Sequence, residues 1–299
     1  MVKILLMGAQ GQVGIELQHT LSSLGAVIAL GRSALDLTQR QQIDQQIEAH
    51  QPQVIVNAAA YTAVDKAEAE PDLAAAINAI APGVMAEAAD RIGATLVHLS
   101  TDYVFDGTQS QPYREDSPTH PQSVYGHTKQ QGEEAIRQAC DRHFILRTAW
   151  VYGAYGKSNF VKTMLRLGAE REELRVVMDQ VGSPTWARDI GGAIAALLQA
   201  ANTSEASLYG TYHFTNSGVA SWYDFAVAIF EEAQYLWFPL QVKRVVPITT
   251  AEFRTPAHRP AYSVLSTTKI AGLMGTPPHW RTSLRKMLAQ WQTHQSLER

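Results

Sequence analysis

The sequence predicts an α/β fold in which a doubly wound parallel sheet is joined to a smaller lobe, built mostly from the C-terminal part of the chain. Three observations predict it. The chain opens with an apolar run that ends in a glycine-rich loop, short apolar runs then alternate with helical patterns up to about residue 148, and beyond that point the pattern changes. Unalternated apolar runs are typical of strands buried on both faces, and repeated strand–helix–strand units form parallel sheets with right-handed crossovers.

Five apolar runs in the first half are the expected strands. They are Ile4–Met7, Val27–Leu30, Val54–Asn57, Leu96–Ser100 and Phe144–Arg147. Between the first two runs, apolar residues recur at the spacing of a helix, at Val13, Leu17, Leu21 and Leu24. Between the third and fourth runs, the alanine-rich stretch Ala67–Ala89 favours helix, because alanine has the highest intrinsic helix propensity.

The second half carries fewer signals of regular structure. The expected helices and strands there are Phe160–Arg171, Arg175–Met178, Asp189–Ala200 and Tyr212–Phe214, the second and fourth being strands. Ser221 and Asp224 have the spacing of a capping box, which predicts that another helix begins at this point. Prolines are frequent over Pro239–Pro260, where we expect extended segments and loops.

Composition excludes several function classes. With 299 residues, 45% hydrophobic and 18% charged, the chain has the make-up of an ordinary globular protein with room for one large or two modest domains. A net charge of −3 without a basic block argues against a nucleic-acid surface. The single cysteine, Cys140, permits no internal disulfide, and we expect it to be inert. The apolar N-terminal run is too short for a signal peptide or a membrane span, so we expect a cytoplasmic protein.

Gly8, Gly11 and Gly14 follow the first strand and open the first helix, which is the context of a dinucleotide-binding loop. The first glycine permits a tight turn, the second lets the backbone approach phosphate, and the third lets helix and strand pack closely. A pyrophosphate would then meet the free N–H groups of the helix N-terminus. The alternative is a tight turn without a ligand. The loop residues that we expect to contact a cofactor are Gly8, Gln10, Gly11, Gln12, Val13 and Gly14.

The residues after the second strand indicate which nicotinamide cofactor binds. An NAD site usually places an acidic residue there, on the ribose hydroxyls. This chain has Arg32 and Ser33, which could hold a 2′-phosphate, so we expect NADPH in preference to NADH, with NADH still possible. The alternative is that Arg32 is a solvated loop residue. Asp36 and Leu37 come slightly later and are expected to flank the adenine.

These signals divide the chain by role. We expect residues 1–150 to form a Rossmann-type dinucleotide-binding domain. Residues 151–299 are expected to form mostly a substrate-binding lobe that returns in part to the sheet.

Tyr125 and Lys129 are four residues apart, so on a helix they share one face. A free tyrosine has a pKa of about 10, which is too high for easy proton exchange at neutral pH. A nearby ammonium favours the phenolate and lowers that pKa, and it can also hydrogen-bond the nicotinamide ribose. The pair is common by chance, but here it follows a glycine loop. We therefore expect Tyr125 to pass a proton to a carbonyl oxygen, assisted by Lys129.

A hydroxyl group at the end of the fourth strand is expected to complete this site. Residues at the carboxyl edge of a parallel sheet face the ligand crevice, and a hydroxyl there can polarise a carbonyl oxygen. We choose Thr101 over Ser100, because strand alternation turns the neighbour away. The alternative for Thr101 is a turn that closes the strand. Together, Thr101, Tyr125 and Lys129 indicate hydride chemistry on a C=O or CH–OH bond.

Longer segments of the chain carry a resemblance to known proteins. They are Gly8–Gly14, Val54–Glu68, Ser100–Gly107, Tyr125–Lys129, Arg147–Gly153, Asn159-Phe160, Asp179–Thr185 and Arg259-Pro260. On these segments the chain resembles the extended short-chain dehydrogenase/reductase superfamily and, within it, the dTDP-4-dehydrorhamnose reductase family. The resemblance covers nearly the whole chain, and the second and third segments are far more specific than the glycine loop.

The resemblance implies an NADPH-dependent reduction of the C4 keto group of dTDP-4-dehydro-L-rhamnose, which gives dTDP-L-rhamnose. It implies that Tyr125 donates the proton, that Lys129 tunes the pKa of Tyr125 and that Thr101 orients the carbonyl. The residues it places along the cofactor are Ala60, Tyr61 and Thr62, beside Tyr125 and Lys129. The residues it places on the sugar are Thr101, Asp102, Tyr103 and Trp150. Asn78 matches a superfamily asparagine, to which we assign a supporting role.

Other functions of the same fold stay open. Related 4,6-dehydratases need an extra acid and base, usually an Asp-Glu pair after the threonine, whereas Tyr103 follows Asp102 here. Tyr103 and Trp150 could stack on a sugar, or they could be core aromatic residues. The remaining alternatives are a nucleotide-sugar epimerase, another 4-keto-sugar reductase and a non-catalytic NADP-binding regulatory subunit.

Some members of the family form a dimer around Mg²⁺ held by glutamates. Glu16 matches one such position, but Arg188 stands where another is expected, and a cation repels a metal ion. We therefore expect no metal, and a monomer or weak homodimer. Arg259 and Lys162 are candidates to hold the substrate's diphosphate, although Lys162 could be a solvated surface residue. His98 lies on a buried strand and is expected to be a core histidine.

Overall fold

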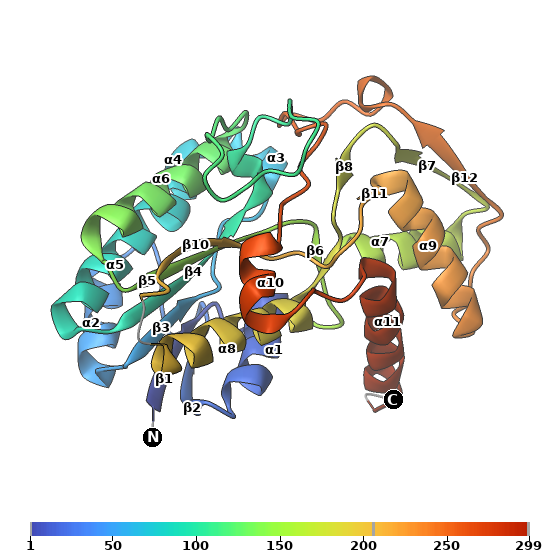
Figure 1. Cartoon of the computed structure of the whole chain (residues 1–299). Coiled ribbons are helices and arrows are strands. Elements are labelled where there is room, and N and C mark those ends of the chain that lie inside the picture. Colours follow the sequence, from blue (N-terminus) through green and yellow to red (C-terminus); the bar gives the residue numbers. More distant parts are fainter. Residues whose placement is uncertain (1, 205–206, 298–299) are drawn as a thin grey trace.

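The computed structural model describes residues 2–204 and 207–297, and at its centre is a six-stranded sheet (Figure 1). The strands lie in the order β10-β5-β4-β3-β1-β2, and every neighbouring pair is parallel. Their bounds are Val2–Met7 (β1), Gly25–Leu30 (β2), Val54–Asn57 (β3), Thr95–Thr101 (β4), His143–Thr148 (β5) and Gly210–His213 (β10). Because β2 lies on one side of β1 and β3 on the other, the strand order reverses between β1 and β3.

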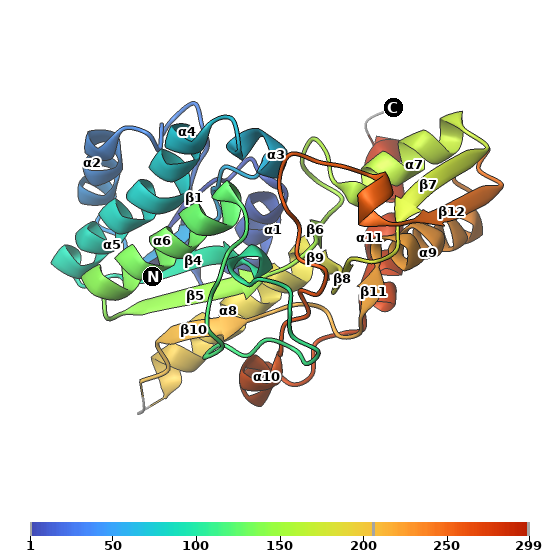
Figure 2. The same cartoon turned by 90° about the horizontal axis from the view of Figure 1, so that it is seen from above.

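Helices cover both faces of the sheet (Figure 2). The helices on one face are α1 (Gln12–Leu21) and α8 (Ala187–Thr203). Those on the other face are α2 (Arg40–His50), α5 (Ala81–Ile92) and α6 (Val124–Ala139). The two faces have separate apolar cores, which is the arrangement of a doubly wound α/β fold. The fold class predicted from the sequence is therefore confirmed.

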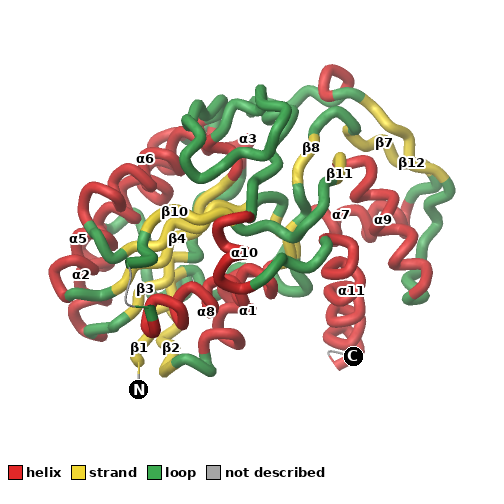
Figure 3. The backbone as a smooth tube through the Cα atoms, in the orientation of Figure 1, coloured by secondary structure: helices red, strands yellow, loops and turns green. Residues whose placement is uncertain are grey.

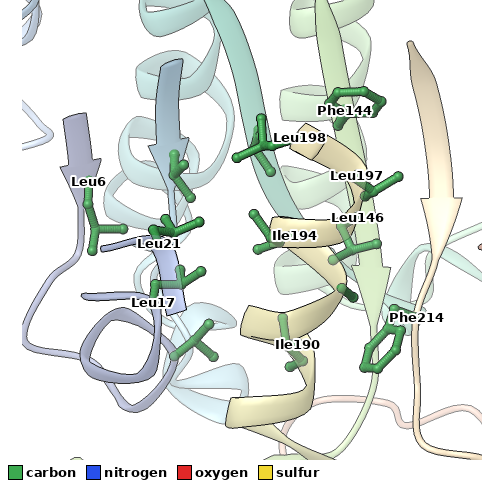
Figure 4. Packing of buried hydrophobic residues seen from close by; sticks show 14 of the residues in the cluster. Leu6, Leu17, Leu21, Phe144, Leu146, Ile190, Ile194, Leu197, Leu198 and Phe214 are labelled. Atoms are coloured by element: carbon green, nitrogen blue, oxygen red, sulfur yellow. The ribbon is translucent and has the colours of Figure 1, made fainter. Parts of the chain in front are cut away.

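The second half of the chain completes the core on the α1 face. Figure 4 shows Ile190, Ile194 and Leu197 of α8 packed among side chains of the sheet and of α1. These residues recur three and four positions apart, so they lie on one face of the helix. β10 likewise adds the sixth strand beside β5, with Tyr212 opposite Leu146. The sheet and its cover are therefore built from both halves of the chain.

The alanine-rich stretch that was expected to favour helix is mostly helical in the structure, but it is divided into several elements. Its parts are α3 (Val64–Ala67), α4 (Pro71–Ala75), a π-helical turn (Ala76–Ile80) and α5. Pro71 begins α4 because proline has no N–H group with which to continue a preceding helix. The π-helical turn carries the buried side chain of Asn78. Such turns occur frequently at functional sites.

Beside the sheet lies a smaller group of elements with its own apolar core, linked to it by loops that Figure 3 shows in green. Its helices are α7 (Phe160–Glu170), α9 (Trp222–Tyr235) and α11 (Trp280–Leu297), while α10 (Thr268–Met274) packs near α8. Its paired strands are β7 (Glu173–Val177) with β12 (Arg244–Ile248), β6 (Val151–Tyr152) with β9 (Thr185–Trp186), and β8 (Val181–Gly182) with β11 (Ala220–Ser221).

The predicted capping box is present at the start of α9. The Ser221 hydroxyl accepts the N–H of Asp224 at 3.0 Å, and the Asp224 carboxylate accepts the N–H of Ser221 at 2.9 Å. The sequence analysis did not identify α2, α10 or α11, and within Pro239–Pro260 it named no strand, although β12 lies there. Within the described residues, none of the helices combines the length and the apolar composition that a bilayer span requires.

Candidate active site

The loops that follow β1 and β3 meet where the strand order reverses. Gly8 has φ +82°, and a Cβ there would lie 2.6 Å from the backbone nitrogen of Ala59. A Cβ on Gly14 would lie 2.1 Å from the Gly8 carbonyl oxygen, so only glycine lets α1 begin this close to β1. A Cβ on Gly11 would meet only that oxygen, at 3.4 Å. Packing within the chain therefore explains why positions 8 and 14 require glycine. At Gly11 the missing side chain instead leaves room for a ligand to approach the backbone.

The start of α1 fits an anion. Gly11 is the N-cap residue and has no side chain with which to satisfy the N–H groups of the first turn. Those N–H groups and the positive end of the helix dipole favour a phosphate at this point. The Gln12 side chain turns aside and donates to the carbonyl oxygen of Val151 at 3.2 Å, while Val13 is buried beneath the loop. The residues present thus fit the pyrophosphate of a dinucleotide.

The end of β2 lies beside the glycine loop, whose backbone donates two hydrogen bonds to the carbonyl oxygen of Leu30 at 3.0 and 3.1 Å. The Gln10 side chain packs over Gly31, where a Cβ would lie 2.6 Å from it. Arg32 and Ser33 follow directly and are both exposed. Their proximity to the loop is compatible with contact to a 2′-phosphate, which stays a prediction.

Asp36 and Leu37 make contacts of their own. The Asp36 carboxylate accepts the N–H and the hydroxyl of Thr38 at 2.9 and 2.8 Å, and these hydrogen bonds lower the pKa of Asp36. Leu37 packs on the apolar core beneath α2. Neither contact tests the role beside an adenine.

Ala60, Tyr61 and Thr62 form the loop after β3, and Asn78 fixes that loop in place. The side-chain oxygen of Asn78 accepts the N–H of Tyr61 at 2.8 Å, and its nitrogen donates to the carbonyl oxygen of Tyr61 at 3.1 Å. The same nitrogen donates to the Thr128 hydroxyl on α6 at 3.2 Å. Asn78 therefore ties this loop to α6, which is the geometry of a supporting residue.

Thr101 and Tyr125 come together at the carboxyl end of β4. Ser123 caps α6 by accepting the N–H of Gly126 at 3.2 Å, so Tyr125 lies in the first helical turn. The Thr101 hydroxyl lies close enough to the Tyr125 phenol to lower its pKa. The Tyr103 ring stands edge-on to the Tyr125 ring, with the ring centroids 5.5 Å apart. The Thr101 hydroxyl and the Tyr125 phenol thus lie near each other at the carboxyl edge of the sheet.

The electrostatics of Tyr125 differ from the expectation. Burial raises the pKa of Tyr125 to about 12; the neighbouring Thr101 hydroxyl lowers it, and the charge of Asp102 raises it. From the sequence we expected the Lys129 ammonium to lower this pKa. The difference arises because burial is the largest influence and because the described hydrogen bonds of Lys129 point into the sheet. A phenol with a high pKa holds its proton at neutral pH, as a proton donor must.

Lys129 lies one helical turn after Tyr125 and is fully buried. Its Nζ donates to the carbonyl oxygen of Leu99 at 2.6 Å and lies 3.0 Å from Nε2 of His98. Burial lowers the pKa of Lys129 to about 8, although the charge of Glu133 acts in the opposite direction. The amine therefore gains and loses a proton closer to neutral pH than an exposed lysine does.

Asp102 and Tyr103 form a short turn after β4. Asp102 is 2% exposed; its Oδ1 accepts the Thr101 hydroxyl at 3.0 Å, and its Oδ2 is buried without a hydrogen-bond partner among the described residues. Burial raises the pKa of Asp102 to about 6. Burial, together with the charge of Asp102, also raises the pKa of Tyr103. An unusually basic carboxylate thus lies against Thr101.

Trp150 is held in an uncommon conformation after β5. Its φ is +48°, which is costly for a bulky residue and is often associated with functional sites. Its indole stacks on Trp222 with 3.5 Å between ring centroids and 5° between planes. A Cβ on Gly182 would lie 2.6 Å from the indole. Trp222 covers one face of Trp150, so a sugar could stack only on the other face.

Arg259 joins a late segment of the chain to the region after β3. It forms two hydrogen bonds with Asp65, from Nη2 to Oδ2 at 2.7 Å and from Nη1 to Oδ1 at 3.0 Å. A diphosphate would have to compete with Asp65 for this guanidinium. Lys162, the other candidate cation, donates to the carbonyl oxygen of Gly156 at 2.8 Å and lies over the Trp291 ring.

A buried polar network beneath α6 was missed by the sequence analysis. The Glu133 carboxylate accepts the Ser100 hydroxyl at 2.6 Å and two Arg147 N–H groups at 2.9 and 2.6 Å. Ser100 thus faces α6, as strand alternation predicts. Glu133 lies eight residues after Tyr125 on the same helix. That spacing was the only sequence signal that could have pointed to Glu133 as part of this region.

Glu16 lies in a fully buried position between α1, α8 and α11. Its Oε2 accepts the Arg188 Nε–H at 3.0 Å, and its Oε1 accepts the Gln290 amide at 3.3 Å. A cation thus stands where a second metal-binding carboxylate was considered. In the part of the chain that the structure describes, no group of three or more His, Cys, Asp or Glu side chains is placed to hold a metal ion. The lack of a bound Mg²⁺ stays a prediction.

Comparisons with known proteins agree with this geometry. Residues 2–293 match the family described as RmlD substrate binding domain. A dTDP-4-dehydrorhamnose reductase from Burkholderia thailandensis is 45% identical over 97% of this chain and 100% of its own length. A crystal structure of a dTDP-4-dehydrorhamnose reductase from Clostridium acetobutylicum has a TM-score of 0.90 and 41% identity, and covers 97% of this chain and 100% of its own. One from Bacillus anthracis, in complex with NADP, has a TM-score of 0.89 and 40% identity at the same coverage.

Proposed function

The chain belongs to the RmlD substrate binding domain family, and from this premise we propose that it reduces the C4 keto group of dTDP-4-dehydro-L-rhamnose with NADPH, giving dTDP-L-rhamnose. A relative at 45% identity over nearly the whole chain bears the name of this reductase, and a structural neighbour at 40% identity was solved with NADP. The observation in the molecule that carries the proposal is the contact of the Thr101 hydroxyl with the Tyr125 phenol, one turn before the buried Lys129.

Tyr125 is the proposed proton donor. Its high pKa keeps the phenol protonated until the C4 oxygen gains negative charge, and the proton then passes from Oη to that oxygen. Thr101 would hydrogen-bond the same oxygen and polarise the carbonyl. Lys129, when protonated, stabilises the phenolate that remains, because an ammonium one turn away lowers the energy of a nearby anion.

NADPH, when bound, supplies the hydride that reaches C4. The backbone N–H groups at the start of α1 would hold its pyrophosphate, and Arg32 with Ser33 would hold its 2′-phosphate. Asp102, Tyr103, Trp150 and Arg259 are the proposed substrate contacts. The open face of Trp150 would stack on the sugar. Arg259 would release its hydrogen bonds to Asp65 and bind the diphosphate instead.

NADPH oxidation with dTDP-4-dehydro-L-rhamnose tests the proposal directly. We expect one NADPH consumed for each sugar reduced, with the product identified by NMR. Tyr125→Phe removes the hydroxyl group that carries the transferable proton, so kcat should fall by about 100-fold or more while NADPH binding is retained. Tyr235→Phe is the matched control, since Tyr235 is 79% exposed on α9.

The same assay separates the other functions. A sugar that is epimerised without net NADPH oxidation would identify an epimerase. NADPH binding without turnover of any keto-sugar nucleotide would identify a regulatory subunit. Either result would reject the reductase.

The finer predictions about organisation belong to the same proposal. Residues 1–150 would bind mainly the cofactor, and residues 151–299 would supply most of the substrate site. A cytoplasmic location and a monomer or weak homodimer are predicted as well. Cell fractionation and sedimentation of the purified protein test these last two.

A further inference from the structure

Beneath Lys129 lie two buried polar side chains, Asn57 and His98, that the proposed function does not use. Asn57 ends β3, His98 lies in β4, and Lys129 projects from α6; all three are buried. Nδ2 of Asn57 lies 3.0 Å from Nδ1 of His98, and Nε2 of His98 lies 3.0 Å from Nζ of Lys129. Both distances are those of hydrogen bonds, so each contact holds one shared proton.

The direction of these hydrogen bonds follows from the backbone. The N–H of Ala59 donates to Oδ1 of Asn57 at 3.1 Å, which fixes the orientation of the amide. The Asn57 nitrogen, which can only donate, therefore faces His98. Nδ1 of His98 must accept this bond and carries no proton. A neutral imidazole then carries its proton on Nε2, the atom that faces Lys129.

His98 is neutral in these surroundings. Burial lowers the pKa of His98 well below its usual value, and the charge of Lys129 lowers it further. The buried charged groups on the packed elements include Glu133 of α6, which is paired with Arg147 of β5 at 2.6 Å, and Asp102 after β4. The pairing of Glu133 with Arg147 leaves His98 without a carboxylate partner among the described contacts.

An N–H group aimed at Lys129 favours the amine over the ammonium. A neutral amine can accept the His98 N–H and still donate to the Leu99 carbonyl oxygen. An ammonium has no lone pair with which to accept that N–H, so two donors would face each other. We propose that Asn57 and His98 are positioning residues that orient Lys129 and weaken its hold on a proton, which limits the pH range in which Lys129 supplies a positive charge to the Tyr125 site. This inference rests on the proposed function only in making Lys129 the partner of Tyr125.

The tautomer of His98 is the first test, and it needs no turnover. Protein labelled with ¹⁵N-histidine has ten histidines, and the signals missing from His98→Gln identify His98. We expect the neutral Nε2–H tautomer at pH 7. A neutral Nδ1–H tautomer, or an imidazolium at this pH, would overturn the inference.

The pH profile of kcat is the second test. In His98→Gln, the amide can turn its oxygen to the ammonium, so the alkaline limb of the profile should move upward by about one pH unit. His143→Gln is the matched control: His143 is also buried, and its described hydrogen bond goes to the carbonyl oxygen of Cys140, away from the site. That variant should leave the limb in place.

The two tests separate the failure of each proposal. A fall in kcat at every pH, without movement of the limb, would mean that His98 only supports the fold, and would overturn the inference. Lack of turnover in the unmodified enzyme would instead reject the reductase, and the tautomer alone would then decide the arrangement at His98.

Discussion

Glu133→Gln tests how strongly the buried ion pair beneath α6 stabilises the fold. Glu133 and Arg147 are both buried, and the carboxylate accepts two Arg147 N–H groups at 2.9 and 2.6 Å. It also accepts the Ser100 hydroxyl at 2.6 Å and an Arg137 N–H at 3.2 Å. Glutamine keeps the shape of the side chain but replaces one carboxylate oxygen with an amide NH₂ group. The Arg147 guanidinium stays charged and loses its anionic partner.

We expect Glu133→Gln to lower the free energy of unfolding by about 3–5 kcal/mol, the cost of removing one partner of a buried pair. Arg137→Ala is the matched control, because the Arg137 side chain is 37% exposed and its bond to Glu133 should contribute about 0.2–1 kcal/mol. The double variant Glu133→Leu with Arg147→Met removes both charges and should recover much of the loss.

Equilibrium urea unfolding at neutral pH, followed by circular dichroism, measures these free energies. Acid provides a second measurement. Burial alone would raise the pKa of Glu133, but the hydrogen bonds and charge of Arg147 hold it below its usual value. Its stabilisation is therefore complete above the unfolded-state pKa of about 4.3 and is lost as the pH falls through the lower folded-state pKa. The difference in the free energy of unfolding between Glu133→Gln and the unmodified protein should therefore shrink as the pH falls. A neutral-pH cost no larger than that of Arg137→Ala would refute the reasoning.

Three further substitutions probe the site. Gly14→Ala should abolish NADPH binding in a fluorescence titration or prevent folding, because a Cβ would lie 2.1 Å from the Gly8 carbonyl oxygen; normal binding by a folded variant would contradict this. Arg32→Ala should lower kcat/KM for NADPH by about tenfold or more and spare NADH, since a charge-assisted phosphate contact is lost; equal losses for both cofactors would count against that role. Asp102→Asn should raise the thermal stability at pH 8 but not at pH 4. The folded-state pKa of Asp102 is raised from 3.8 to about 6, so its favourable protonated form is lost as the pH rises through that value, and the gain should be up to about 3 kcal/mol. A pH-independent difference in melting temperature would argue otherwise.

Local geometry is what the sequence predicts well. Tyr125 and Lys129 share a helix face because of the period of the α-helix, and Thr101 and Ser100 point to opposite sides because of the alternation of a strand. The contacts of Thr101 with Tyr125 and of Ser100 with α6 follow from these two rules. Gly14 is predictable for a similar reason, since a Cβ there would meet the backbone of Gly8 and Ala9, only a few residues away, whereas the backbone that crowds Gly8 belongs to Ala58 and Ala59 on the loop after β3.

The contacts that the sequence analysis missed depend on strand order and on long-range closure. Asn57 reaches His98 only because β3 lies beside β4, and no local pattern specifies that neighbour. Asp65 and Arg259 are 194 residues apart, so their pairing requires the whole chain to be folded. The direction of the Lys129 side chain, and the burial that raises the pKa of Tyr125, follow from the same packing. These features depend on the folded chain as a whole.

The late position of α8 and β10 in the chain affects how this protein can be synthesised and trimmed. A nascent polypeptide that has reached residue 150 displays Leu6, Val56 and Leu146 without the cover that Ile190 and Ile194 later provide. An exposed apolar face of this kind attracts chaperones or promotes aggregation on the ribosome. A soluble truncation that keeps the nucleotide loop should therefore graft the 187–214 segment onto residues 1–150, rather than stop at the last strand of the first half.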